Sequence, residues 1–331
     1  MSLPNDFDNI PRICVAQLPT PVHGLPRLSK SLLGPRILVK RDDQTGLATG
    51  GNKARKLEYL VADAIAKGSD TLLTAGAPQS NHCRQTAAVA ALKGLNCDLI
   101  LGGEEPEIWN GNLLLDRLLG ARAHFTEKEK RSVKMDEIAA DLKKQGRRPY
   151  VIPIGGSNGV GALGYVRAMV ELQGQLKQLG EKVDRIVFGS SSGGTQAGMA
   201  LGARIAGFSG QVLGISVDQE KLDDLPYQRE LAEISNESAK LIGSEEQFGP
   251  TDYELSYDYL GGGYGVVGDM EREAIQLCAG TEGLLLDPVY TGRAFGGMID
   301  LIRKSYISSD ETVLFWHTGG TSALFGYAGE I

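Results

Sequence analysis

Short apolar runs alternate with longer stretches whose apolar residues recur at helical spacing through most of the chain. Runs such as residues 37–40 and 71–74 are only four residues long, which is typical of buried strands. Between them, residues 57–67 carry apolar side chains at helical spacing and stop at Gly68, a residue type that often ends helices. Strands that alternate with helices in this way predict an α/β fold with largely parallel, twisted sheets flanked by helices.

The same pattern predicts the other elements. Further strands are expected at residues 98–101, 122–125, 150–152, 185–188, 211–216 and 313–316. Further helices are expected at residues 85–92, 112–119, 135–145, 162–179, 196–205, 270–278 and 292–304. Residues 222–256 show little strand pattern and hold one candidate helix at 228–241. Because single cores stop growing near ~250 to 300 residues, 331 residues favour two lobes that share a cleft.

Composition and charge narrow the class of protein. With 42% hydrophobic and 23% charged residues, the chain is typical of a globular protein. A net charge of -7 and the lack of a basic patch disfavour a nucleic-acid partner. The start, MSLPNDFDNIPR, does not resemble a signal peptide, and no run approaches the ~18 apolar residues of a membrane span. We expect no nucleic-acid and no membrane partner.

Four cysteines lie far apart, at Cys14, Cys83, Cys97 and Cys278. They form no CxxC pair and no cluster with histidine at metal spacing, so neither a disulfide framework nor a metal site is predicted. This favours a cytoplasmic protein.

A lysine follows two glycines just before a predicted helix, in the run GGNK that ends at Lys53. The helix dipole favours anions at a helix start, so a lysine there is poorly placed unless it is buried or paired with a ligand. Burial would lower its pKa and make the amine a better nucleophile toward an aldehyde. A solvated basic turn with Arg55 and Lys56 would have the same sequence, and the motif alone leaves both interpretations open.

A second run, SSSGGT at residues 190–195, lies between a predicted strand and a predicted helix. Hydroxyls and unobstructed amides at a helix N-terminus suit a phosphate group. The run lacks the ending of a nucleotide P-loop and the GxGxxG spacing, so it favours a small phosphate-bearing cofactor over ATP or NAD. A helix capped by serine without any ligand is the alternative.

The run GAPQSNH places Ser80 and Asn81 between a strand and a helix, where either could simply cap the helix. The functional interpretation gives both residues a contact with a ligand. His82 is expected to be a packing or surface residue, and Cys83 and Arg84 to point away from the site.

Three hydroxyl side chains stand in loops that could converge. These are Tyr264 in GGGYG, Tyr290 in LLLDPVYTG and Thr318 after the strand VLFWH. Each tyrosine could instead be a half-buried core residue with its hydroxyl satisfied. His317 is not accompanied by a GxSxG elbow, so a Ser-His-Asp hydrolase is disfavoured.

With these motifs the chain resembles the family of pyridoxal-phosphate enzymes that contains D-cysteine desulfhydrase and 1-aminocyclopropane-1-carboxylate deaminase. The resemblance covers residues 11–327 and rests on the motifs KRDD, GGNKARKLEYL, GAPQSNHCRQTAA, PYVIPIGGSN, SSGGTQAG, LDPVYTG and HTGG. It implies the fold of the tryptophan synthase β-subunit group (fold type II). It also implies a smaller domain of residues 53–162 inserted in a larger one of residues 1–52 and 163–331, and a homodimer.

The resemblance also implies roles for individual residues. Lys53 would hold pyridoxal 5′-phosphate as a Schiff base, and Asn81 would bond the ring hydroxyl oxygen. Thr318 would face the ring nitrogen. The phosphate would be held by Ser192, Gly193, Gly194 and Thr195. Lys53, Ser80, Tyr264 and Tyr290 would be catalytic, and Ser80, Asn81 and Thr291 would contact a small amino-acid substrate.

The implied activity is α,β-elimination by a carbon-sulfur lyase, with D-cysteine giving pyruvate, hydrogen sulfide and ammonia. L-cysteate sulfo-lyase is the alternative, with sulfite released, and the motifs do not separate the two. The deaminase has glutamate and leucine where this chain has Thr291 and Thr318, which counts against ring opening. A binding protein without turnover is disfavoured because Lys53 is retained.

Overall fold

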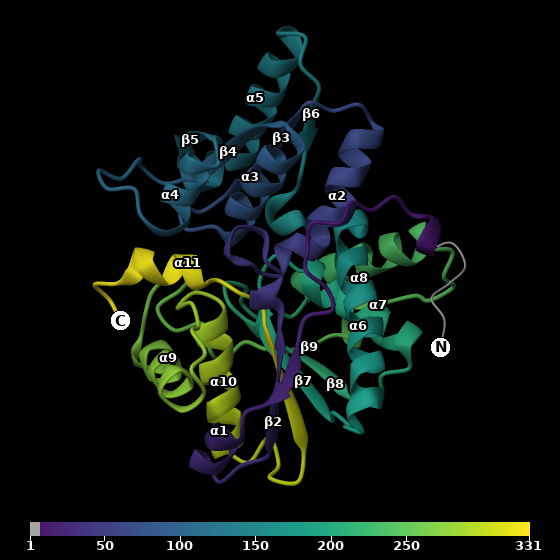
Figure 1. Ribbon diagram of the computed structural model, residues 1–331, viewed down its shortest axis with the longest axis vertical. Coiled ribbons are helices and arrows are strands. Elements are labelled where there is room, and N and C mark those ends of the chain that lie inside the picture. Colours follow the sequence, from purple (N-terminus) through teal and green to yellow (C-terminus); the bar gives the residue numbers. More distant parts are fainter. Residues whose placement is uncertain (1–6) are drawn as a thin grey trace.

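The computed structural model describes residues 7–331 and has the α/β architecture that the alternating pattern predicts. Residues 1–6, which begin the predicted larger domain and the stretch compared with a signal peptide, lie outside the described residues. The strands form two sheets, and Figure 1 shows the smaller sheet with its helices above the larger one. No helix within residues 7–331 has both the length and the apolar character required to cross a membrane.

The larger sheet has six strands in the order β1-β2-β10-β7-β8-β9. Its strands are β1 (Val22–Gly24), β2 (Arg36–Arg41), β7 (Arg185–Ser190), β8 (Gln211–Ser216), β9 (Glu254–Ser256) and β10 (Thr312–His317). Strand β1 is antiparallel to β2, and the other neighbouring strands are parallel. In β2, Ile37 and Val39 enter one hydrophobic cluster and Leu38 enters another, which is the two-residue period of a sheet that is buried on both faces.

Helices cover both faces of this sheet. The first face packs against α1 (Pro26–Ser31), α9 (Asp269–Glu282) and α10 (Thr291–Arg303). The second packs against α6 (Gly159–Leu179) and α7 (Gly194–Ala206), over which α8 (Pro226–Leu241) lies. A short helix, α11 (Thr321–Leu324), follows β10.

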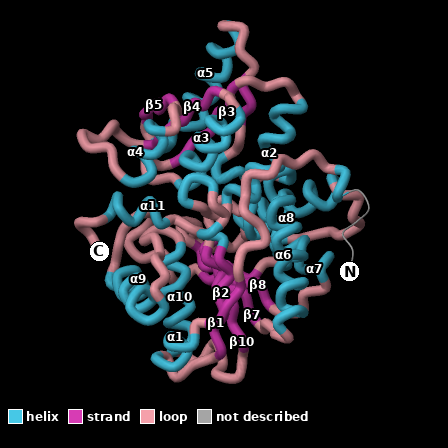
Figure 2. Tube along the Cα trace, in the orientation of Figure 1, coloured by secondary structure: helices cyan, strands magenta, loops and turns pink. Residues whose placement is uncertain are grey.

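The smaller sheet has four parallel strands in the order β5-β4-β3-β6. They are β3 (Thr71–Gly76), β4 (Asn96–Gly102), β5 (Arg122–Thr126) and β6 (Pro149–Val151). One face packs against α2 (Lys53–Ala66), α3 (Asn81–Lys93) and α4 (Gly111–Leu118), and the other against α5 (Arg131–Lys144). Figure 2 shows the two groups of strands separated by helices and loops.

The predicted strands and helices are all present, but several helices begin at an earlier residue than their apolar periodicity indicates. Helix α2 begins at Lys53 rather than at Leu57, and α3 begins at Asn81 rather than at Gln85. The first turns of these helices are polar in sequence, so hydrophobic spacing does not reveal them. The pattern also misses β1 and β9, which are edge strands of three residues each.

Candidate active site

A pocket of about 300 Å³ lies where the carboxyl ends of the strands of both sheets meet. Strands β3 and β4 end in it at Gly76 and Gly102, and β7 ends in it at Ser190. Loops after β5, β6, β8 and β10 complete its wall. Because ligands of open α/β proteins bind outside the carboxyl ends of parallel strands, this pocket is the candidate active site.

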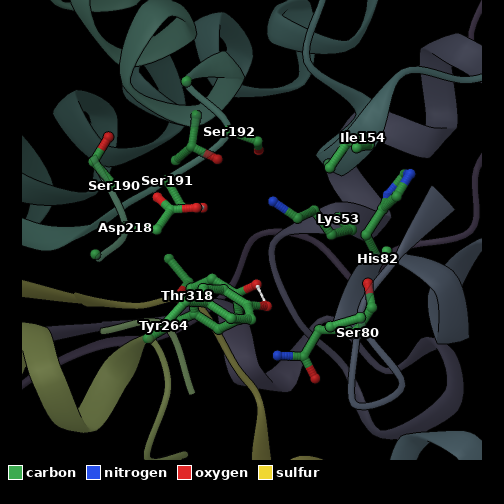
Figure 3. A pocket seen from close by; sticks show the side chains of 18 of the residues that line it. Lys53, Ser80, His82, Ile154, Ser190, Ser191, Ser192, Asp218, Tyr264 and Thr318 are labelled. Carbon is green, nitrogen blue, oxygen red and sulfur yellow. Dashed lines mark hydrogen bonds between the residues drawn. The ribbon is translucent and has the colours of Figure 1, made fainter. Parts of the chain in front are cut away.

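Most of the residues predicted for the site line this pocket together, although they span more than 260 positions of the chain. They are Lys53, Ser80, Asn81, Ser192, Gly193, Thr195, Tyr264, Tyr290 and Thr318. Figure 3 shows Lys53 and Ser80 on one side of the pocket, facing Ser192, Asp218 and Tyr264 on the other. Gly194 lies directly behind the lining, and Thr291 does not line the pocket.

Lys53 is the first residue of α2, and its amine points into the pocket (Figure 3). Desolvation lowers the pKa of Lys53 to about 8. A substantial fraction of the amine is therefore neutral near pH 7.5, which is the form that attacks an aldehyde. Arg55 and Lys56 are 1% and 0% exposed, so the alternative of a solvated basic turn is wrong.

A buried ion network holds the start of α2 in place. The Arg55 guanidinium donates to both oxygens of Asp42 at 2.9 Å and to Glu171 at 2.9 and 3.0 Å. Burial alone would raise the pKa of Asp42, but Arg55 and Lys40 outweigh it and lower the pKa to about 2. Since Arg55 is two residues from Lys53, this network also positions the lysine.

Residues 190–194 form the loop before α7, called the α7 cradle below. Side chains in place of its glycines would clash with neighbouring atoms. Gly193 has a φ of +84°, and a Cβ atom on Gly194 would lie 2.8 Å from the Ser157 hydroxyl and 2.9 Å from Lys56 Nζ. The Gly194 amide donates to the Ser157 hydroxyl at 3.1 Å. Burial and the charge of Lys53 hold the pKa of Lys56 well below its usual range. Amides at a helix start, beside a buried lysine side chain that forms no ion pair within residues 7–331, fit a phosphate group.

Asn81 is oriented by its neighbours. Its Oδ1 atom accepts from Arg84 at 3.1 Å and from Asn112 at 2.9 Å, so its Nδ2 group is left to donate. This suits the predicted contact with a ring hydroxyl oxygen. Cys83 and Arg84 do not line the pocket, as expected, but Arg84 is fully buried and also donates to the Gly50 carbonyl at 2.6 Å. Arg84 thus connects the start of α3 with the turn before Lys53.

Ser80 caps α3, because its hydroxyl accepts from the Cys83 amide at 3.2 Å, and it lines the pocket as well. His82 is buried and also lines the pocket. Thr74 donates its hydroxyl proton to the Ile152 carbonyl, so it accepts from His82 Nε2, at 2.9 Å. Burial, with the charges of Lys53 and Lys56, keeps the pKa of His82 well below its usual range. His82 is therefore neutral and has a free acceptor, Nδ1.

Two tyrosines form a pair on the opposite wall. The hydroxyls of Tyr264 and Tyr290 are 2.5 Å apart, and the rings meet edge to face at 5.9 Å (Figure 3). Burial raises the pKa of both tyrosines, so both hydroxyls keep their protons at neutral pH. Thr318 stands nearby at the end of β10. Thr291 instead bonds the Asp287 carboxylate, at 2.7 Å, and is 1% exposed.

Several pocket residues are not singled out by the sequence motifs. Among them are Asn52 beside Lys53, Asp218 after β8, and Lys128 and Arg131 after β5. Asp218, Lys128 and Arg131 each stand a few residues beyond a strand that the sequence predicts. The rule that ligands gather at strand carboxyl ends could have drawn attention to them.

Comparisons with known proteins agree with this geometry. A family model described as pyridoxal-phosphate dependent enzyme matches residues 13–319. A curated D-cysteine desulfhydrase from Klebsiella pneumoniae (strain 342) is 43% identical, and a second one from another strain of that species is also 43% identical. Both alignments cover 99% of this chain and 99% of the relative.

Several solved structures have a similar fold. An ACC deaminase homologue, at 39% identity, superimposes with a TM-score of 0.87 and covers 98% of this chain and 96% of its own. A hydrogen sulfide-producing enzyme (Fn1220) from Fusobacterium nucleatum has a TM-score of 0.63 over 96% of this chain and 98% of its own. At 16% identity, that likeness shows the fold alone. The fold class and the family resemblance predicted from the sequence are confirmed.

Proposed function

The chain belongs to the family of pyridoxal-phosphate dependent enzymes, and from this premise we propose that it converts D-cysteine to pyruvate, hydrogen sulfide and ammonia. The observation that carries the proposal is the shared pocket, in which Lys53, the α7 cradle and the tyrosine pair face one another. The full-length relation to D-cysteine desulfhydrases supports this substrate over others.

The proposed roles follow from the local geometry. The amides at the start of α7, with Lys56 behind them, hold the phosphate of the cofactor, and Asn81 donates to its ring oxygen. Thr318, which lines the pocket after β10, would contact the ring nitrogen. When bound through Lys53, pyridoxal phosphate withdraws electrons from the α-carbon of the amino acid. Ser80 and Asn81, at the start of α3, orient the amino acid itself.

Two kinds of group are available to move protons. The Lys53 amine, with its pKa of about 8, suits removal of the α-proton. Tyr264 and Tyr290 keep their hydroxyl protons at neutral pH, so they suit donation to the departing sulfur. Because the tyrosine hydroxyls stay protonated, Lys53 is favoured over a tyrosine as the base that removes the α-proton.

The test is a panel of substrates. The purified protein would be incubated with D-cysteine, L-cysteine, L-cysteate, β-chloro-D-alanine and the cyclopropane amino acid, and pyruvate or 2-oxobutyrate would be measured. We expect pyruvate and sulfide from D-cysteine, and negligible 2-oxobutyrate. Efficient ring opening would instead assign the chain to the deaminase branch, and no product from any substrate would leave a binding protein without turnover.

We also propose that the enzyme is a cytoplasmic homodimer. The free state of all four cysteines within the described residues supports a reducing compartment. Light scattering of the purified protein would test the dimer, and fractionation of cells would test the location.

A further inference from the structure

A buried ion pair lies behind the tyrosine pair of the pocket. Arg293 is in the first turn of α10, three residues after Tyr290, and is fully buried. Its Nε atom donates to one carboxylate oxygen of Glu271 at 2.7 Å, and Glu271 is buried as well. The other oxygen of Glu271 accepts from the Gly268 amide at 2.9 Å, at the start of α9. The ion pair therefore joins the starts of α9 and α10.

The guanidinium group of Arg293 also binds residues 261–267, which carry Tyr264 and are called the Tyr264 loop below. Its Nη1 atom donates to the carbonyl of Gly263, directly before Tyr264, at 3.0 Å. Its Nη2 atom donates to the carbonyl of Val266, two residues after Tyr264, at 2.9 Å. Arg293 thus holds the loop on both sides of the tyrosine.

The other contacts of the Tyr264 loop within residues 7–331 are weaker. The loop lies between β9 and α9 and contains neither helix nor strand. The Val266 amide donates to the Gly263 carbonyl at 3.3 Å, and the partly exposed Arg272 donates to the Val267 carbonyl, also at 3.3 Å. Val266 is 48% exposed, so the loop is not held by a buried apolar side chain at this position. The two short bonds from Arg293 are therefore a main restraint on the loop.

The sheet gives this restraint a fixed reference. Nη1 of Arg293 donates at 3.0 Å to the carbonyl of Val217, which follows β8 directly. One planar guanidinium therefore connects the end of a sheet strand, the Glu271 carboxylate and the Tyr264 loop. A lysine could keep the ion pair with Glu271, but its single ammonium group could not reach the carbonyls on both sides of Tyr264 as well.

We propose that Arg293 and Glu271 are positioning residues of the elimination, which keep the Tyr264 hydroxyl beside that of Tyr290 so that it can protonate the departing sulfur. This role rests on the proposed function, because it concerns the proton donor of that reaction. The two hydroxyls are 2.5 Å apart, and a small movement of the loop would separate them. Arg293 itself does not line the pocket, so it acts through the backbone of the loop.

The proton balance shows which substrates need this donor. When the carbon-sulfur bond of D-cysteine breaks, its electron pair stays on sulfur, and a proton from Tyr264 turns the departing HS⁻ into hydrogen sulfide. The α-proton taken by Lys53 makes up for the proton that the phenol gives away, so no other proton source is required. Chloride, the leaving group of β-chloro-D-alanine, is the anion of a strong acid and leaves without a proton. A misplaced Tyr264 should therefore slow the reaction of D-cysteine and not that of β-chloro-D-alanine.

The experiment compares these two substrates with the holoenzyme. Arg293→Lys keeps the charge opposite Glu271 and loses the planar fork. We expect it to lower kcat for D-cysteine about 10-fold, to leave KM within about 2-fold, and to leave kcat for β-chloro-D-alanine within about 2-fold. In a Tyr264→Phe background, the same change should lower kcat for D-cysteine by less than about 2-fold, because the donor is already absent.

A second variant tests the loop without altering a buried charge. Gly263 has a φ of +104° and nothing lies within 4 Å of its Cβ position, so Gly263→Ala strains the backbone without a clash. Gly283→Ala, at the end of α9, is the matched control, because its φ is also positive and its Cβ position is also open. Gly263→Ala should slow D-cysteine selectively, and Gly283→Ala should keep the rates of the parent. If Arg293→Lys does not fold, Gly263→Ala decides in its place.

Three results would overturn the positioning role and leave the proposed function intact: equal losses for both substrates, a loss that persists in the Tyr264→Phe background, and unchanged rates in Arg293→Lys. If the parent turns over no substrate, the proposed function fails, and hydrogen exchange of the peptide that contains Tyr264 decides. Faster exchange in Arg293→Lys than in Gly283→Ala would support the positioning role, and equal exchange would overturn it.

Discussion

At the scale of single residues, Lys53 combines an amine that faces the pocket with a pKa of about 8. The low pKa comes from desolvation, and the hydrogen bond with Lys56 opposes it only in part. An ordinary surface lysine has a pKa of ~10.4 and is protonated at neutral pH. The pKa of Lys56 is lowered too, but Lys56 does not line the pocket, so Lys53 is the lysine placed to react with an aldehyde there.

A first prediction concerns this reactivity. In the cofactor-free protein, labelling of Lys53 by an aldehyde and borohydride should rise with pH and level off above about 8, because only the neutral amine reacts. Peptide mass spectrometry from pH 6 to 10 would measure it, with the exposed Lys93 as the comparison. Borohydride treatment of the holoenzyme should fix the cofactor on Lys53. Recovery of the label on another lysine would contradict the assignment.

Thr291 shows how a single contact changes an expectation. The sequence comparison with the deaminase suggests a glutamate at this position as a switch of activity. The structure places the Thr291 hydroxyl 2.7 Å from the Asp287 carboxylate, in a buried position outside the pocket lining. A glutamate here would set two carboxylates side by side without water, which is unfavourable for folding.

We predict that Thr291→Glu lowers the midpoint of thermal unfolding and does not by itself produce ring opening. Thr291→Ser, which keeps the hydroxyl, should unfold near the temperature of the parent. Thr318→Leu should fold normally but lower β-elimination, because Thr318 lines the pocket. Thermal unfolding and release of 2-oxobutyrate would be measured for each. A stable Thr291→Glu protein that opens the cyclopropane ring would disprove this prediction.

At the scale of elements, we propose that the loop before α7 and the start of the helix together bind the phosphate of the cofactor. The loop depends on glycine for two reasons. Gly193 needs a positive φ, and Gly194 needs the space next to Lys56 and Ser157. A side chain at Gly194 would push apart the groups that we propose bind the phosphate.

We predict that Gly194→Ala raises the dissociation constant of pyridoxal phosphate at least about 10-fold, because its Cβ atom would fall within 3 Å of Lys56 Nζ. Gly174→Ala in α6 is the matched control, since nothing lies within 4 Å of that position, and it should bind cofactor normally. Helix propensity should make this control as stable as the parent or up to ~1 kcal/mol more stable. Spectroscopic titration of the cofactor-free proteins would measure both. Unchanged affinity in Gly194→Ala would place the phosphate elsewhere.

At the scale of the whole molecule, the network of Asp42, Arg55 and Glu171 connects α2 with the turn directly after β2 and with α6. Asp42 has a pKa of about 2 in the folded state, below the ~3.9 of an unfolded chain. Its contribution to stability is therefore fully present above pH ~4 and is lost as the pH falls toward 2.

We predict that Asp42→Asn destabilises the protein by about 3 to 5 kcal/mol at pH 7, because it removes one partner of a buried charge pair. The difference from the parent should shrink below pH 4, since the parent then loses the same charge. Urea unfolding between pH 3 and 7 would measure it. Asp141→Asn, which removes an exposed carboxylate paired only with the exposed Lys144, should scarcely move the midpoint. A difference that is constant with pH would show that the charge of Asp42 is not the cause.

We also propose that residues 53–162 form the smaller domain and the rest the larger one. The four strands of the smaller sheet all lie between Thr71 and Val151, which supports this division. The first turn of α2, however, packs against α6, since a Cβ on Gly164 would lie 2.3 Å from the Arg55 carbonyl. Limited proteolysis should cut in the connection between β6 and α6 before it cuts either sheet, and early cuts within β3 or β4 would contradict the division.

The sequence alone determined the elements and the family. Strand and helix periods are local, so residues such as 37–40 and 57–67 reveal their structure without knowledge of their partners. The motifs, together with the family resemblance, also predicted that Lys53, Asn81 and the loop at 190–195 belong to one site, and all three line the same pocket.

The tertiary structure decided what depends on distant contacts. The order of strands, such as β10 between β2 and β7, arises from pairing between segments more than 100 residues apart, which no local pattern encodes. Burial lowers the pKa of Lys53, and Thr291 is buried at a position that does not line the pocket. Lys128 and Arg131 read as ordinary surface charges in the sequence, and they belong to the site only because folding brings the ends of two sheets together.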